Sequence, residues 1–132
     1  MKARWTDAGM GRRVPMVRVG IRRRGKTMAT ASLLLIDTGA DSTVLPSYTA
    51  KMLGIGEADL KSERCGVAGG EMPFRRLIDV ADTEIEIDGS WLPVPSLTFT
   101  DQILHPVLGR DFIFSHFSLR MTGTEFELLP IP

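Results

Sequence analysis

The sequence has little cysteine, no excess charge of either sign and no long apolar run. Its 132 residues include one cysteine, which excludes an internal disulfide and a zinc site built on several cysteines. Lys and Arg total 16, as do Asp and Glu, so the chain is not a polycation built to bind nucleic acid or an acidic membrane. The longest purely apolar run, at 33–36, is far shorter than the ~20 residues that cross a bilayer. The first residues carry positive charge with no apolar stretch behind it, so we expect no secretory signal and a cytoplasmic location.

The composition indicates one folded domain. Hydrophobic residues make up 43% of the chain and charged residues 24%, a balance typical of globular rather than disordered proteins. A chain of 132 residues suits a single core. Residues 1–13 are polar and show no periodicity, so we expect a flexible N-terminal arm there and one domain over residues 14–132.

Alternating apolar and polar residues predict a mostly β domain. Residues 84–87 alternate glutamate with isoleucine, and an Asp-Gly turn leads to a returning strand over 91–99. The two glutamates are expected to face solvent. Pro93 and Pro95 place the returning strand at a sheet edge or a bulge. The remaining strands are predicted at 14–22, 27–36, 119–121 and 126–128.

Two short segments have helical features. Residues 47–54 begin with Ser47, which can cap a first turn, and end with Gly54, which can adopt a left-handed stop. Residues 110–117 predict one or two further helical turns. The residues therefore predict an all-β fold with one or two short helices.

The strongest chemical signal is Asp37-Thr38-Gly39, directly after the apolar run at 33–36. A buried strand would give the carboxylate a rigid base, and Gly39 would let the backbone turn where a side chain would obstruct it. The Thr38 hydroxyl can bond a neighbouring backbone group. The same three residue types also favour a plain turn, so both interpretations stay open at this point.

A second element strengthens the catalytic interpretation. Residues 107–111 read Val-Leu-Gly-Arg-Asp: two apolar residues and a glycine precede a charged pair that opens a predicted helix. Between this element and the aspartate lies a glycine-rich segment, Cys65–Gly70, which is suited to a hairpin tip.

In this order, the three segments resemble the retropepsin-like aspartic proteases, a family that includes the retroviral proteases and bacterial relatives. The resemblance spans about residues 14–129 and implies a closed, small β-barrel-like monomer that forms a two-fold dimer. It implies a peptide substrate, no metal and no cofactor, and it matches Asp37, Thr38 and Gly39 to the catalytic turn. It assigns substrate binding to Ala40, Asp41, Gly66, Val67, Ala68, Gly69, Gly70, Val107 and Leu108, and structural support to Gly109, Arg110 and Asp111.

The resemblance also implies individual roles. Residues 66–70 would form a flap that closes over the substrate, and Thr38 would reach across to the opposite subunit. Asp41 would bond the substrate backbone and pair with Arg110, although a plain surface ion pair between the two stays open. Asp111 would support the catalytic turn from beneath.

The chemistry of this family requires two copies of the chain. Peptide hydrolysis by aspartates uses two carboxylates around one water, one as base and one as hydrogen-bond donor to the scissile carbonyl. The only other Asp-Thr pair, Asp82-Thr83, is followed by glutamate and lies in a strand pattern. If Asp37 is catalytic, its partner is Asp37 of a second chain across a two-fold axis. The sequence therefore predicts a homodimeric aspartic endopeptidase.

Other interpretations compete with these. The fold could serve a catalytically inactive dimer that binds peptides or assembles a complex. The basic cluster at 22–26 is typical of a solvated hairpin tip rather than a nucleic-acid patch. Cys65 is interpreted as a small apolar filler rather than a redox-sensitive thiol. His105 and His116 lack the helical spacing of metal ligands.

Overall fold

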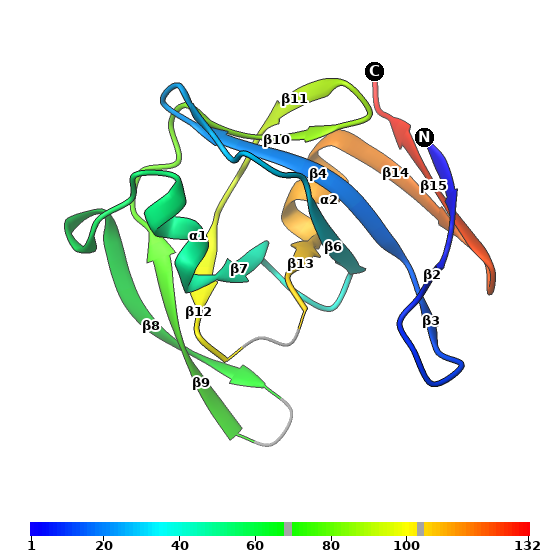
Figure 1. Ribbon diagram of the computed structural model, residues 1–132, viewed down its shortest axis with the longest axis horizontal. Helices are drawn as coiled ribbons and strands as arrows, with labels where there is room; N and C mark the ends of the chain where they lie inside the picture. The colour runs from blue at the N-terminus through cyan, green and yellow to red at the C-terminus, as the bar shows by residue number, and fades with distance from the viewer. Residues whose placement is uncertain (68–69, 103–104) are drawn as a thin grey trace.

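The computed structural model describes residues 1–67, 70–102 and 105–132. One large sheet contains ten of the strands, in the order β11-β10-β4-β6-β13-β7-β12-β9-β8, with β5 paired to β4 (Figure 1). These strands are β4 (Met16–Arg23), β5 (Lys26–Thr27), β6 (Ser32–Asp37), β7 (Val44–Pro46), β8 (Leu60–Val67), β9 (Gly70–Leu77), β10 (Thr83–Ile87), β11 (Ser90–Pro93), β12 (Thr98–Thr100) and β13 (Val107–Gly109).

Two smaller sheets and three short helices complete the described part of the chain. Strands β1 (Lys2–Arg4), β15 (Glu125–Pro130) and β14 (Phe117–Met121) form a three-stranded sheet. Strands β2 (Thr6–Asp7) and β3 (Arg13–Val14) form a two-stranded one. Helix α1 (Ser47–Met52) packs against β7 and β12, α2 (Arg110–His116) packs against β13 and β14, and η1 (Glu57–Asp59) is a single 3₁₀ turn. In the described part of the chain, no helix has the length and hydropathy needed to span a bilayer.

The core joins these elements through alternating strand residues. On β4, Val17, Val19 and Ile21 are buried while the residues between them are exposed or half-buried, as a strand with one core face requires. Phe99 of β12 and Phe112 of α2 are both about 1% exposed or less. Burial of this apolar surface is the main favourable term that holds the sheet against the helices.

The large sheet is open, which corrects the expectation of a closed barrel-like monomer. Its terminal strands are β11 and β8, and within the described residues these two do not pair with each other. The chain leaves β11 at Pro93, and Pro95 follows in the break before β12. Because proline has no N–H to donate to a further strand, Pro93 suits the edge position that β11 occupies.

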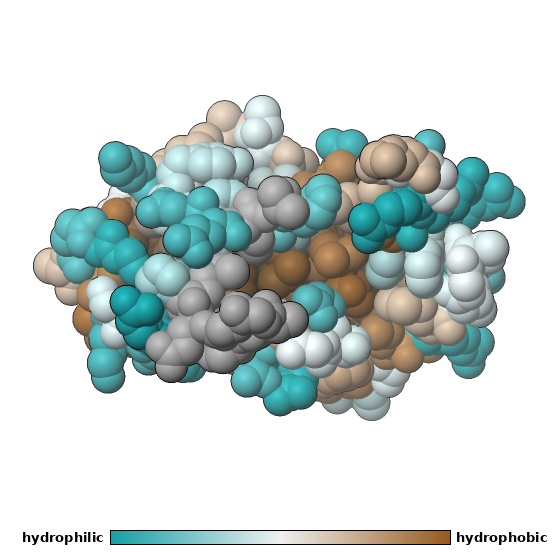
Figure 2. All heavy atoms as spheres, turned by 90° about the horizontal axis from the view of Figure 1, so that it is seen from below, coloured by the Kyte–Doolittle hydropathy of each residue, from teal (hydrophilic) through white to brown (hydrophobic). Residues whose placement is uncertain are grey.

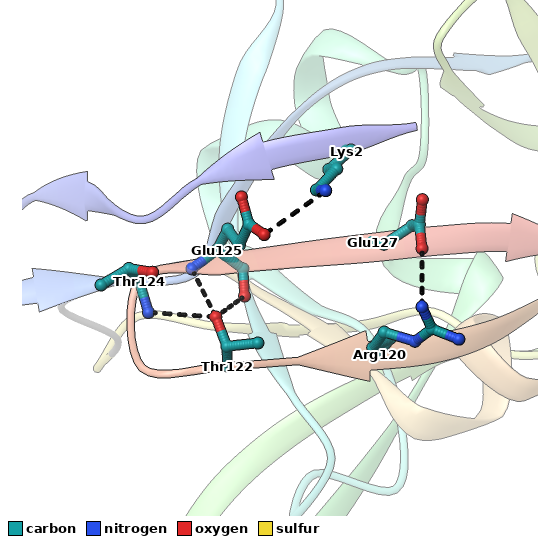
Figure 3. Close-up of polar contacts among 6 residues, drawn as sticks. All are labelled: Lys2, Arg120, Thr122, Thr124, Glu125 and Glu127. Carbon is teal, nitrogen blue, oxygen red and sulfur yellow. Dashed lines mark hydrogen bonds and ion pairs between the residues drawn. The ribbon is translucent and has the colours of Figure 1, made fainter.

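Residues 1–13, expected to form a flexible arm, contribute strands instead. β1 pairs with β15 in antiparallel register, with Ala3 opposite Phe126. Exposed ion pairs lie across this sheet, from Lys2 Nζ to Glu125 at 3.4 Å and from Arg120 to Glu127 at 3.9 Å (Figure 3). The sequence pattern is weak here because strands of two or three residues are too short to display a period.

Several other predictions can be compared with the structure. The 84–87 and 91–99 hairpin is present as β10 and β11, with β11 at the sheet edge as its prolines predict. The return beyond Pro93 is interrupted and resumes only as β12. Gly54 has φ +71° and ends α1, as predicted, whereas Pro46 rather than Ser47 occupies the cap position and makes no side-chain cap bond.

Candidate active site

The Asp37 carboxylate lies at the end of β6, in the interior of the large sheet between β4 and β13. Leu34 and Ile36 are 0% and 5% exposed, so the strand that carries Asp37 is anchored in the core. The Gly39 N–H donates to Asp37 Oδ1 at 2.9 Å, and the Ala40 N–H donates to the Asp37 carbonyl at 3.2 Å. These bonds hold the carboxylate on a tight turn whose Thr38 and Gly39 are exposed.

The second motif lies beside the first. β13 runs parallel to β6, with Leu108 opposite Ile36 and Gly109 opposite Asp37. Leu108 is fully buried and Val107 half-buried. The tertiary structure thus brings together the two segments that the sequence analysis singled out.

Gly109 is required by the close approach of the segment after the Asp37 turn. A Cβ at this position would lie 2.5 Å from the Ser42 carbonyl oxygen and 2.6 Å from the Thr43 nitrogen, with the Ser42 carbonyl carbon closer still. The Gly109 N–H also donates to Thr43 Oγ1 at 3.1 Å, and Thr43 is fully buried. Backbone packs directly on backbone here, which only glycine allows.

Asp41 and Arg110 form the ion pair that the resemblance implies. The Arg110 N–H donates to the Ala40 carbonyl at 2.9 Å, so the backbone also joins the two segments. The side chains of Asp41 and Arg110 are 82% and 53% exposed. A pair this exposed contributes little to stability, and its carboxylate is accessible to a ligand.

Beneath this turn lies a hydroxyl cluster, which we define as Ser42, Ser96, Thr98 and the Asp111 carboxylate. Ser42 Oγ is 2.7 Å from Ser96 Oγ and 3.0 Å from Thr98 Oγ1. Ser96 Oγ donates to Asp111 Oδ2 at 2.5 Å. Asp111 therefore supports the turn through serines that the sequence analysis missed. No sequence signal marks them, since 54 residues separate Ser42 from Ser96.

The glycine-rich segment belongs to a long hairpin. β8 and β9 pair from Leu60 opposite Leu77 to Val67 opposite Gly70, and in Figure 1 they extend beyond β12. Gly66 and Val67 are therefore strand residues, which corrects the prediction that the whole of 65–70 is a tip. Ala68 and Gly69 lie outside the described residues, so the expected flap contacts cannot be assigned to them. The strand pairing continues through Gly66 and Gly70 because backbone hydrogen bonds do not need side chains.

The base of this hairpin is tied to η1. Arg75 Nη1 donates to Glu57 Oε1 at 2.7 Å, and the same two side chains form an ion pair. A cavity of about 530 Å³ lies next to this pair, between α1, the hairpin and the end of β12. Figure 2, which views the molecule from below, shows apolar surface exposed beside the grey residues.

Two of the four basic residues in the cluster at 22–26 pair with acidic side chains. Arg22 Nε donates to Glu84 Oε1 at 2.9 Å and its guanidinium lies 4.2 Å from the centre of the Trp91 ring. Arg24 pairs with Asp79 at 3.1 Å. Glu84, expected to face solvent alone, is thus a half-buried partner of Arg22.

The His116 ring is held in place by a backbone carbonyl and an aromatic neighbour. His116 Nε2 lies 2.7 Å from the Pro93 carbonyl, and its ring packs edge-on against Phe112 at 4.9 Å between centroids. Over residues 1–67, 70–102 and 105–132, no three His, Cys, Asp or Glu side chains gather in a way that could bind a metal ion.

Comparison with known proteins agrees with this geometry. Residues 18–112, or 95 of the 132, match the model of a family described as aspartyl protease. Among solved structures, a retropepsin-like aspartic protease from Rickettsia conorii matches with a TM-score of 0.63 and 16% identity, over 98% of each chain. At that identity the similarity shows the fold alone. No curated protein matches the chain.

Proposed function

Because the chain belongs to the aspartyl protease family, we propose that it is an aspartic endopeptidase that cleaves extended peptides as a homodimer. The observation that carries the proposal is the position of Asp37. It ends a buried strand, opposite Gly109 of the second motif, on a turn held by the Gly39 N–H. Each chain supplies one such turn, while the reaction needs two carboxylates.

In the proposed mechanism, the two Asp37 carboxylates share one proton and hold a water between them. The ionised member takes a proton from the water as it attacks the scissile carbonyl, and the protonated member donates a hydrogen bond to the carbonyl oxygen. Two carboxylates at such short range do not both ionise readily, so the pair titrates as a unit.

The surrounding residues have supporting roles in this proposal. Thr38, which is exposed at the turn, would bond to the opposite subunit and brace the two aspartates. Asp41, with its accessible carboxylate, would bond the substrate backbone. The β8–β9 hairpin would cover the bound peptide and reduce its contact with water.

Two further observations support a peptide substrate and a second copy as the partners. Apolar surface is exposed on the face seen in Figure 2, and Leu33 of β6 is 41% exposed, which suits burial against another chain. The pairing of Arg22 and Arg24 with acidic groups argues against nucleic acid as a partner. We also propose a cytoplasmic location, on the basis of the single cysteine.

The test is digestion of a peptide library by the wild-type protein and Asp37→Asn, with Asp82→Asn as a matched control. Asp82 is the other aspartate followed by threonine, and its φ of +58° is one that asparagine tolerates. We expect cleavage by the wild type and by Asp82→Asn, and a loss of about 10³-fold or more in Asp37→Asn. Equal cleavage by Asp37→Asn would overturn the mechanism.

Mixing wild-type and Asp37→Asn chains tests whether two chains form one active site. With excess Asp37→Asn chains, only wild-type pairs carry two carboxylates, so activity should fall as the square of the wild-type fraction. Sedimentation should show dimers under the assay conditions. A linear fall, or cleavage by a strict monomer, would overturn the homodimeric site. If the wild type binds peptides and never cleaves them, the chain is a binding module.

A further inference from the structure

The hydroxyl cluster is more ordered than its residue types suggest. Ser96 and Thr98 are 4% and 7% exposed, and the Ser42 hydroxyl lies within 3.0 Å of both. The cluster connects three parts of the chain that are distant in sequence: the segment after the catalytic turn, the start of β12 and the start of α2. Buried hydroxyls that satisfy one another in this way restrict the backbones that carry them.

The Asp111 carboxylate, at one end of the hydroxyl cluster, sets the direction of the hydrogen bonds between the hydroxyl groups. An ionised carboxylate has no proton, so Ser96 must donate to Asp111 Oδ2. A hydroxyl has one proton, so Ser96 can only accept from Ser42, and Ser42 can then only accept from Thr98. The Thr43 carbonyl, 3.2 Å from Ser42 Oγ, is a weaker alternative acceptor because it lies farther away than Ser96 Oγ, at 2.7 Å. The result is a directed relay, Thr98 to Ser42 to Ser96 to Asp111.

We propose that Ser42 and Ser96 are positioning residues for substrate binding: the relay holds the Asp41–Thr43 segment against the start of α2 and thereby sets the place of the Asp41 carboxylate. This rests on the proposed protease function. Asp41 directly precedes Ser42, and its ion-pair partner Arg110 directly precedes Asp111, so two members of the relay, Ser42 and Asp111, each adjoin one member of that pair. The exposed pair cannot fix its own position, and the buried relay beneath it does.

Removal of either serine hydroxyl breaks the same relay. Ser96→Ala removes the acceptor that lies 2.7 Å from Ser42 Oγ and the donor to Asp111 Oδ2, while Ser42→Ala leaves Ser96 without its donor. Ser96→Thr keeps the hydroxyl and is the conservative rescue. Ser118→Ala is the matched control, because Ser118 is an exposed serine on β14, away from the turn.

Steady-state kinetics on a cleaved peptide test the proposal. We expect Ser96→Ala and Ser42→Ala each to raise KM about 10-fold with kcat changed less than about 2-fold, since the catalytic Asp37 turn is held by its own bonds. The double variant should resemble either single variant, because both break one relay. Ser96→Thr should restore KM, and Ser118→Ala should leave it unchanged. Additive effects, or a fall in kcat with KM unchanged, would overturn the proposal.

Amide hydrogen exchange tests the relay without activity. The Thr98 and Gly109 N–H groups bond to Thr43, next to Ser42, and their exchange should speed up about 10-fold in both alanine variants but not in Ser118→Ala. Unchanged exchange at both amides would overturn the relay. A wild type that shows this exchange pattern and cleaves no peptide would instead refute the proposed function, so the two failures are distinguishable.

Discussion

Two regions of the molecule use polar groups in opposite ways. The Asp37 cradle, which we define as residues 37–43, 96–98 and 107–111, is joined by hydroxyl groups and by backbone packed on backbone at Gly109. The terminal sheet, β1, β14 and β15, buries Phe126 and Leu128 and carries its charges on the outside (Figure 3). The difference teaches that burial, more than the number of polar contacts, decides how much each contact matters.

A glycine-to-alanine change in each region gives the largest contrast. In the cradle, Gly109→Ala forces a methyl group against the Ser42–Thr43 backbone, so we expect a loss of about 3 kcal/mol or more in the free energy of unfolding. In the terminal sheet, a Cβ at Gly123 meets nothing within 4 Å, so Gly123→Ala should change it by less than about 1 kcal/mol. Urea unfolding measures the loss of stability in both variants, and equal losses would contradict the difference between the two regions.

Threonine-to-valine changes give an intermediate effect, because they delete a hydroxyl at nearly constant volume. Thr43→Val leaves the buried Gly109 N–H without its acceptor, and we expect a loss of about 1–3 kcal/mol. Thr122 bonds the Thr124 and Glu125 N–H groups in an exposed turn, where water can replace it (Figure 3). Thr122→Val should therefore cost less than about 1 kcal/mol. A larger loss in Thr122→Val than in Thr43→Val, measured by thermal or urea unfolding, would contradict the role of burial.

Removal of a charged group should change the free energy of unfolding least, and by a similar amount in both regions. Asp41→Asn and Glu125→Gln each break an exposed ion pair, and we expect changes below about 1 kcal/mol in unfolding free energy. Under the proposed function the two variants should differ in peptide binding, because only Asp41 adjoins the Asp37 turn. Unfolding in low and high salt together with peptide affinity checks this, and a large stability loss in Asp41→Asn would show that the cradle depends on the ion pair.

Local patterns predicted the elements whose residues carry their own signal. The alternation at 84–87 corresponds to β10, the helix at 47–54 to α1, and the charged pair at 110–111 to the start of α2. The last hairpin, predicted at 119–128, is present as β14 and β15. Each of these depends on neighbours a few residues away, which is the range over which periodicity and turn chemistry act.

The predictions that were wrong depended on distant partners. The large sheet is open because, within the described residues, its edge strands β11 and β8 do not pair with each other. β1 is a strand because β15 lies beside it. Glu84 does not face solvent alone because it pairs with Arg22 of the neighbouring strand, whose guanidinium lies over Trp91. None of these contacts can be predicted from the residues that are adjacent in the sequence.

The sequence by itself predicted that an aspartate on a glycine turn follows a buried strand, and it holds one such turn where the proposed function needs two carboxylates. Only the tertiary structure decided what holds that turn in place. Ser42, Ser96 and Asp111 come within hydrogen-bond distance because β12 and β13 both lie next to β7 in the sheet. The physical reason is range: propensity and periodicity act over a few residues, whereas a buried hydrogen bond needs two atoms to meet in space, however far apart they are in the chain.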